Sequence, residues 1–164
     1  MPIYKILNIG IELLKRIKTL HSHGIIHRDI KPSNILYGNF STFDISEKNA
    51  LYIVDYGLSC KYICINNNHY EYSITQKFVG THKFASRHSL NTEKLSRRDD
   101  VESIFYVLIF LFKGNLPWEE ISKKYHGVEK YEKIRDNMID IDIKTFLNGL
   151  PNVFKFIYKN IIML

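Results

Sequence analysis

The sequence has few cysteines, no long hydrophobic run and no leader-like start. Only 2 of its 164 residues are cysteine, Cys60 and Cys64. A zinc site needs two further ligands at suitable spacing, and a disulfide-stabilised fold needs more bridges, so we expect reduced thiols. The longest apolar run, Ile104 to Phe112, has 9 residues, whereas a membrane-spanning helix needs about 20. The first residues, Met-Pro-Ile-Tyr-Lys, lack a signal-peptide layout. We therefore expect an intracellular protein, cytoplasmic or nuclear, without a membrane partner.

Acidic residues are fewer than basic ones, but the excess is weak evidence for a nucleic-acid partner. Lys and Arg number 23 against 17 Asp and Glu, which gives a formal net charge of +6. Lysine is far commoner than arginine, as in the product of an A/T-rich coding sequence, so part of the charge reflects codon use. We do not expect nucleic acid as a partner. Hydrophobic residues make up 45% of the chain, enough for a packed core, and this composition excludes wholesale disorder.

The hydrophobic pattern predicts a mainly α fold with a small β insert. Two short apolar runs, Ile35–Tyr37 and Leu51–Val54, are typical of strands joined by a long polar loop. The segment from Val101 to Phe112 is apolar nearly all round, which indicates a helix buried on every side. A first helix that ends near Gly24 is predicted by apolar residues at three- and four-residue intervals, namely Ile6, Ile9, Leu13, Ile17 and Leu20.

The segment between the first helix and the first strand carries the residues most typical of chemistry. Residues 27–34 read H-R-D-I-K-P-S-N, and D-Y-G follows at 55–57 after the second strand. Phosphoryl transfer needs a carboxylate that orients the attacking hydroxyl, a cation on the phosphate and oxygen ligands for Mg²⁺. The two segments match the kinase signature H-R-D-L-x-x-x-N and D-F-G except at Ile30 and Tyr56. The groups that meet these needs are the side chains of Asp29, Lys31, Asn34 and Asp55.

With four further blocks in the same order, the chain resembles the C-terminal lobe of a Ser/Thr protein kinase of the casein kinase I superfamily. Residues 80–86 resemble that family's G-T-x-R-Y-A-S, and residues 96–103 its S-R-R-D-D-L-E-S. Residues 116–118 match its L-P-W, and residues 130–134 its K-Y-E-[KR]-I. D-Y-G is similar to the related vaccinia-related kinases, which usually replace the arginine of H-R-D with glycine, unlike Arg28.

The resemblance implies a protein-kinase-like fold of which the chain holds the C-terminal lobe only, without the N-terminal β lobe. We therefore expect residues 1–164 to form a partial protein kinase domain. Its expected parts are a catalytic loop at 27–34, a magnesium motif at 55–57, an activation segment at 55–86 and a buried central helix at about 99–113.

The resemblance also implies roles for individual residues in a reaction that uses ATP and Mg²⁺. Asp29 is expected to be the catalytic base and Lys31 to contact the γ-phosphate. Asn34 and Asp55 are expected to hold Mg²⁺, and Thr81 to bond near the first two and shape the acceptor site. Lysine at position 31 is similar to Ser/Thr kinases rather than tyrosine kinases.

Four further residues receive roles around this site from the resemblance. Leu36 is expected to form the floor under the adenine ring. Asp100 is expected to cap the backbone of the catalytic loop from the buried helix. His27 and Tyr56 are expected to stack in the core beneath the site, so His27 is interpreted as a packed histidine rather than an acid or base.

Two lysines, Lys83 and Lys130, match positions that form a cationic pocket in casein kinase I-like enzymes. The resemblance therefore implies protein substrates that are acidic or already phosphorylated. Lysine in place of arginine at 83 keeps the charge but loses bidentate phosphate geometry. A solvated basic face is the alternative interpretation of these lysines. Arg87 and His88 depart from the family pattern, which has small and apolar residues in this acceptor region.

The sequence contains no G-x-G-x-x-G loop and no strand lysine with a partner glutamate, although a working kinase site requires them. Three hypotheses follow. The chain is a truncated product of a Ser/Thr kinase gene, with catalysis near background on its own. Alternatively, it is a non-catalytic scaffold that binds kinase partners or acidic proteins. In the third, it works only in complex with a separate N-lobe. Intact catalytic groups favour the first hypothesis.

Overall fold

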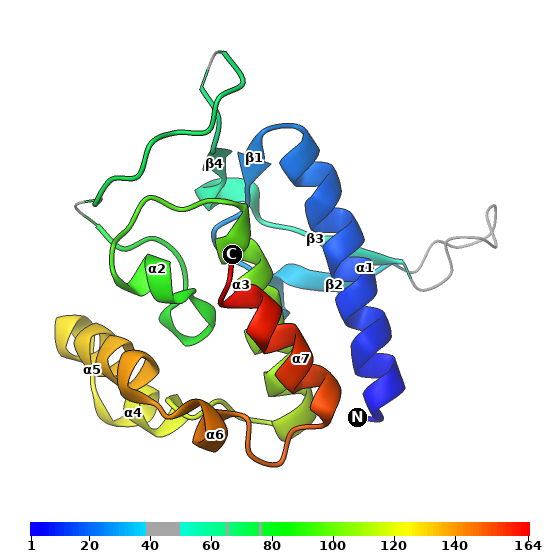
Figure 1. Cartoon of the computed structure of the whole chain (residues 1–164), viewed down its shortest axis with the longest axis vertical. Helices are drawn as coiled ribbons and strands as arrows, with labels where there is room; N and C mark the ends of the chain where they lie inside the picture. The colour runs from blue at the N-terminus through cyan, green and yellow to red at the C-terminus, as the bar shows by residue number, and fades with distance from the viewer. Residues whose placement is uncertain (39–49, 65, 76) are drawn as a thin grey trace.

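The computed structural model describes residues 1–38, 50–64, 66–75 and 77–164, and most of these residues are helical or in turns (Figure 1). The helices are α1 (Ile3–Ser22), α2 (Arg87–Leu90), α3 (Arg97–Lys113), α4 (Glu119–Lys124), α5 (Gly127–Asp140), α6 (Ile143–Phe146) and α7 (Asn152–Ile161). The strands are β1 (Ile25–Ile26), β2 (Ile35–Tyr37), β3 (Leu51–Ile53) and β4 (Cys60–Lys61). The predicted mainly α fold with a small β insert is therefore correct.

Helices α1 and α3 pack against each other at the centre of the fold (Figure 1). A side chain at Gly10 of α1 would place its Cβ 2.9 Å from Leu108 Cδ1 of α3, so glycine allows the two helices to approach closely. The predicted amphipathic pattern of α1 is confirmed, because one face is buried through Ile6, Ile9, Leu13 and Ile17.

Helix α3 is the buried central helix that its apolar sequence predicts. Every residue from Glu102 to Ile109 is buried. At its start, the backbone N–H of Ser96 donates to Asp99 Oδ2 at 2.6 Å, which satisfies a polar group before the helix begins. At its end, Gly114 adopts φ 82, the left-handed conformation in which helices commonly terminate.

The two short sheets bring distant parts of the sequence together. Strand β1 pairs with β4, and β2 pairs with β3, both antiparallel. Asn34 directly precedes β2 and Asp55 follows β3 after Val54. Because the pair is antiparallel, these two residues lie at the same end of the hairpin, where the backbone N–H of Val54 donates to the carbonyl of Asn34 at 2.9 Å.

An aromatic cluster joins α3 to the C-terminal helices. The Phe105 ring of α3 stacks on Tyr158 of α7 with centroids 5.6 Å apart. Trp118 packs edge-on against Tyr106 at 5.2 Å and is 1% exposed. Its Nε1 donates to the carbonyl of Lys83 at 2.8 Å. The aromatic core therefore also fixes the segment that precedes α2.

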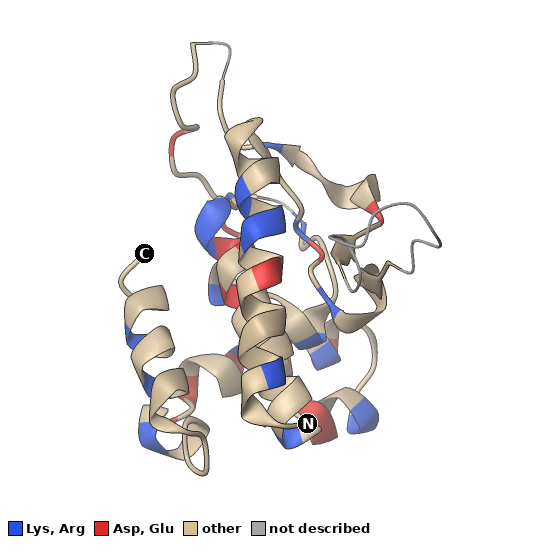
Figure 2. Cartoon of the chain, turned by 90° about the vertical axis from the view of Figure 1, so that its right-hand side faces the viewer, with Lys and Arg blue, Asp and Glu red and all other residues tan. Residues whose placement is uncertain are grey.

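Three further observations concern the surface charge, the lack of a membrane-spanning helix among the described residues, and the cysteines. Figure 2 shows basic residues on several elements, from α1 to the C-terminal helix, so net charge alone does not single out a binding face. In the part of the chain that the structure describes, no helix combines the length and the apolar character needed to cross a bilayer. Cys60 and Cys64 are both free thiols.

Candidate active site

The loop between β1 and β2 has a strained backbone that a buried carboxylate holds in place. Arg28 adopts φ 68, a left-handed conformation that costs a non-glycine residue on the order of 1 kcal/mol. Asp100 of α3, 1% exposed, accepts hydrogen bonds from the backbone N–H groups of His27 at 2.8 Å and Arg28 at 2.9 Å. The Nε2 of His21 lies 2.8 Å from the same carboxylate. The cap that the resemblance predicts from Asp100 is therefore present.

Asp29 stands at the centre of this loop with one carboxylate oxygen engaged and the other free. Its Oδ2 accepts from Lys31 Nζ at 2.6 Å and from Asn34 Nδ2 at 3.4 Å. Asn34 Nδ2 also donates to the carbonyl of Asp29 at 3.0 Å. Among the described residues, Asp29 Oδ1 is buried and has no hydrogen-bond partner. A buried acceptor without a donor is costly, which is typical of a position that a ligand completes.

Thr81 joins this group from the segment that precedes α2. Lys31 Nζ donates to Thr81 Oγ1 at 3.1 Å while it also binds Asp29. Gly80, directly before, adopts φ 113, and a Cβ there would lie 2.6 Å from the carbonyl oxygen of Arg28. Glycine is thus required where the two loops touch. The structure brings Asp29, Lys31, Asn34 and Thr81 into one hydrogen-bonded cluster.

Asp55 carries the second candidate carboxylate, at the end of the β2–β3 hairpin where Asn34 also lies. Its backbone is left-handed, with φ 66, and its Oδ1 accepts from the N–H of Gly57 at 3.3 Å. The side chain is exposed. Among the described residues, the side chain of Asn34 forms hydrogen bonds through Nδ2 alone, so its Oδ1 is available to a ligand.

Asn34 and Asp55 together suit Mg²⁺ better than a tightly caged metal. Among the described residues no three His, Cys, Asp or Glu side chains gather in a way that could hold a metal ion. Mg²⁺ is usually bound by one or two protein oxygens together with substrate phosphates and water, rather than by an all-protein cage. The donor set at this end of the hairpin therefore fits Mg²⁺ held jointly with a nucleotide.

The residues around the cluster match the expectations only in part. His27 is fully buried, its Nε2 lies 3.1 Å from the carbonyl of Val54, and its ring packs on Tyr56 with centroids 5.2 Å apart. Tyr56 itself is 52% exposed, so the prediction that it lies in the core is wrong. Tyr56 follows the end of the β2–β3 hairpin, where the described elements leave about half of the residue exposed. Leu36, in β2, is 50% exposed.

The two lysines expected to form a phosphate pocket have different surroundings. Lys83 forms an ion pair with Glu119, and its Nζ lies 4.3 Å from the ring centroid of Phe110. Its charge is therefore already balanced by a neighbour. Lys130 lies on α5 and forms no ion pair among the described residues. Burial first and the charge of Lys130 second lower the pKa of His82.

Sequence reasoning assigned no role to His21 and Glu102, two polar residues buried inside the fold. His21 follows Leu13 and Ile17 at intervals of four, so its place on the buried face of α1 could have been found. Glu102 lies in the buried helix, where its partner Arg87 comes from a distant segment. Only the tertiary fold reveals that pair.

Comparison with known proteins agrees with this geometry. The family described as "Protein kinase domain" matches residues 2–161. A curated protein of Encephalitozoon cuniculi (strain GB-M1), named "Probable casein kinase I homolog", is 34% identical over 152 residues. That alignment covers 90% of this chain and 45% of the relative, so the chain spans about half the relative's length. The chain therefore belongs to the protein kinase family, and its sequence is casein kinase I-like.

Proposed function

We propose that the chain provides the catalytic half of a protein serine/threonine kinase, which transfers the γ-phosphoryl group of ATP to a Ser or Thr hydroxyl. The observation that carries the proposal is the free, buried Oδ1 of Asp29 beside the Lys31–Thr81 hydrogen bond. Family membership supports kinase chemistry. Lysine two residues after the aspartate, paired with a threonine of the acceptor segment, supports Ser/Thr over Tyr as the acceptor.

In the proposed reaction Asp29 acts on the proton of the acceptor hydroxyl, and Lys31 acts on the transferring phosphate. Asp29 Oδ1 accepts the proton of the attacking hydroxyl, or orients that hydroxyl, while Oδ2 stays bound to Lys31. The ammonium of Lys31 supplies positive charge next to the transferring group, where charge builds up on phosphate oxygens. Thr81 holds Lys31 toward this position from the acceptor side. The preformed contacts reduce the reorganisation that the reaction requires.

Asn34 and Asp55 are the residues that would hold Mg²⁺ at the end of the hairpin. Bound Mg²⁺ neutralises phosphate charge and helps to orient ATP. Leu36, half exposed beside them, provides an apolar surface suited to the adenine ring. The 164 residues contain no glycine-rich loop, so we propose that a segment outside them covers the phosphates, and that these residues alone have activity near background.

Replacing Asp55 with asparagine is expected to weaken Mg²⁺-dependent ATP binding by on the order of 10-fold or more, because the metal loses an anionic ligand. Binding is measured by calorimetry on the full-length product of the gene, with Mg²⁺ and with EDTA. The matched control is Asp140→Asn, at an exposed site at the end of α5. Equal ATP affinity in wild type and Asp55→Asn would contradict the proposed metal role.

We propose acidic or pre-phosphorylated proteins as the substrates, recognised through Lys83 and Lys130. Because Glu119 already balances Lys83, an incoming phosphate must displace that carboxylate, and we expect a moderate preference. Two peptides with the same acceptor serine, one with a phosphoserine upstream, should differ by about 10-fold in kcat/KM. Phosphoamino-acid analysis of the products identifies the acceptor. Equal rates would rule out the pocket, and phosphotyrosine as the product would rule out the Ser/Thr assignment.

A further inference from the structure

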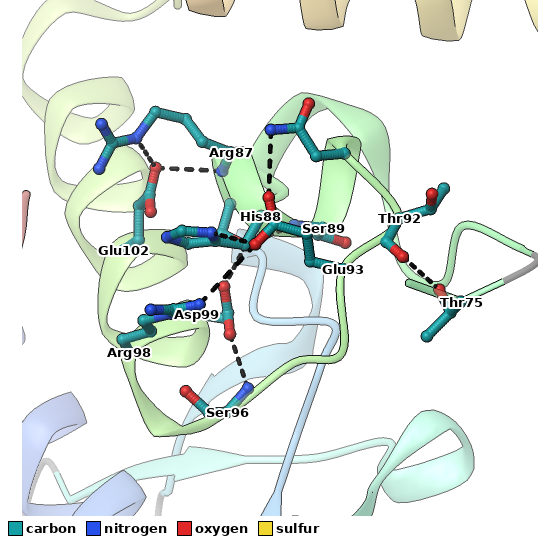
Figure 3. Close-up of polar contacts among 12 residues, drawn as sticks. Thr75, Arg87, His88, Ser89, Thr92, Glu93, Ser96, Arg98, Asp99 and Glu102 are labelled. Carbon is teal, nitrogen blue, oxygen red and sulfur yellow. Dashed lines mark hydrogen bonds and ion pairs between the residues drawn. The ribbon is translucent and has the colours of Figure 1, made fainter. Parts of the chain in front are cut away.

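Arg87, the first residue of α2, points toward Glu102 of the central helix α3 (Figure 3). Its Nε donates to Glu102 Oε1 of α3 at 2.9 Å, and its backbone N–H donates to the same oxygen at 3.2 Å. Its guanidinium carbon lies 5.9 Å from the ring centroid of Tyr158 in α7. Although 29% of the arginine side chain is exposed, its guanidinium contacts Glu102 of α3 and Tyr158 of α7. The basic residue that departs from the family pattern thus has an internal partner.

Glu102, the carboxylate that Arg87 binds, is buried, so its hydrogen bonds come from protein donors. Glu102 is 2% exposed, and Tyr106 OH donates to its Oε1 at 2.5 Å. Burial and then the Glu102 charge raise the pKa of Tyr106 well above 10, so this hydroxyl stays protonated and remains a donor. Burial is the largest single influence and lowers the pKa of Arg87, but the charge of Glu102, its hydrogen bond with Arg87 and the neighbouring tyrosines together outweigh burial, so the net direction is upward. Removing Arg87 would leave Glu102 buried without a counter-charge.

The Arg87–Glu102 ion pair anchors one end of a segment whose other end is hydrogen-bonded to the candidate active site. Thr81 accepts from Lys31, beside Asp29. Six residues later, Arg87 binds Glu102, and the preceding Ser86 donates from Oγ to Asp99 Oδ1 at 2.7 Å. Residues 81–86 therefore run between two fixed ends, the catalytic loop and α3.

We propose that Arg87 is a positioning residue for the acceptor polypeptide: its ion pair with Glu102 fixes residues 81–86 so that Thr81 keeps its place beside Asp29. The inference rests on the proposed kinase function. The acceptor hydroxyl must approach Asp29 Oδ1 past this segment, and a displacement of about 1 Å at a reacting centre can cost on the order of 100-fold in rate. In the proposed function the nucleotide is bound through Asn34 and Asp55, whose side-chain hydrogen bonds among the described residues go to Asp29 and Gly57 and not to residues 81–86. Arg87 therefore acts on the acceptor and leaves ATP binding unchanged.

Three variants of the full-length gene product test this role. Arg87→Met removes the charge and keeps the length of the side chain, and Arg87→Lys keeps the charge but loses the fork geometry. Lys123→Met is the matched control, because Lys123 forms an exposed ion pair with Glu120 on α4. We measure KM for the acceptor peptide, KM for ATP, and amide hydrogen exchange over residues 77–90.

Arg87→Met is expected to raise KM for the peptide about 10-fold and to speed amide exchange in residues 81–86 by a similar factor, with KM for ATP unchanged. Arg87→Lys should recover a large part of both effects, and Lys123→Met should show neither. An unchanged peptide KM overturns the proposal. So does a raised peptide KM without faster exchange, which would mean direct contact with substrate, or faster exchange throughout α1 and α3, which would mean general destabilisation.

The exchange measurement keeps this inference separate from the proposed function. Absence of phosphoryl transfer in the wild-type protein would overturn the kinase function and, with it, any role for Arg87 in catalysis. Transfer by the wild type together with a normal peptide KM in Arg87→Met would overturn only the positioning role. Exchange confined to residues 81–86 shows whether the ion pair fixes the segment in either case.

Discussion

Replacing Asp100 with asparagine is expected to lower the free energy of unfolding by about 3 kcal/mol, because one buried carboxylate accepts three hydrogen bonds. Its two oxygens receive the backbone N–H groups of His27 and Arg28 and face Nε2 of His21. The asparagine side chain has a single carbonyl oxygen. Its NH2 group would therefore face one of these N–H groups, and it cannot accept a hydrogen bond from it. The variant also loses the charge that supports the left-handed backbone of Arg28.

Urea unfolding of wild type and Asp100→Asn measures this loss directly. The matched control is Asp136→Asn, where the carboxylate lies on the surface and pairs only with the neighbouring Arg135. A surface pair of this kind contributes about 0.5 kcal/mol or less. Amide exchange in the loop from 25 to 31 should also become faster in Asp100→Asn. If both variants lose the same small stability, the carboxylate of Asp100 does not hold the loop.

Much of this region could be predicted from the sequence because its signals are local. The helical period of α1, the strands at β2 and β3 and the unbroken apolar run of α3 each depend on neighbouring residues, and all four elements form as predicted. The contacts of Lys31 with Asp29 follow from a spacing of two residues. Residues close in sequence need no knowledge of the fold to be placed together.

Other features depend on which distant surfaces meet, and the sequence does not contain that information in a readable form. Tyr56 looks like a core aromatic, yet it is half exposed because no described element covers the hairpin end. Lys83 looks like a free cation, yet Glu119, 36 residues further on, balances its charge. Arg87 departs from the family pattern without an evident partner in the sequence, yet it reaches Glu102 on the central helix. Each of these features depends on which distant elements meet.

This difference between local and long-range features bears on where the catalytic assignment is strongest. Asp29, Lys31 and Asn34 lie in one loop, and the hydrogen bonds between their side chains join residues that are close in sequence. The proposed phosphate pocket combines Lys83, whose charge Glu119 of α4 balances, with Lys130 of α5, so it depends on residues far apart in sequence. The catalytic loop is therefore the right place to test the chemistry first.

Replacing Asp29 with asparagine is expected to lower kcat for phosphoryl transfer by about 10²–10⁴-fold, the usual contribution of a positioned base. Asparagine matches the carboxylate in shape, so the hydrogen bond from Asn34 Nδ2 to the carbonyl of residue 29 should persist. Lys31 keeps Thr81 as its second partner. The change thus removes the proton acceptor with little disturbance of the loop, and KM for ATP should stay within about twofold of wild type.

Initial rates with the full-length gene product, an acceptor peptide and Mg-ATP separate these quantities, with Asp140→Asn as the surface control. Urea unfolding of the same samples shows whether a loss of rate reflects a loss of fold. Because Asp29 Oδ1 is the buried carboxylate oxygen without a donor in the described cluster, it is the atom best placed to receive the hydroxyl proton. A kcat within about twofold of wild type would remove Asp29 from the role of base. A lost kcat with unchanged stability and ATP affinity would leave proton acceptance or hydroxyl orientation as its contribution.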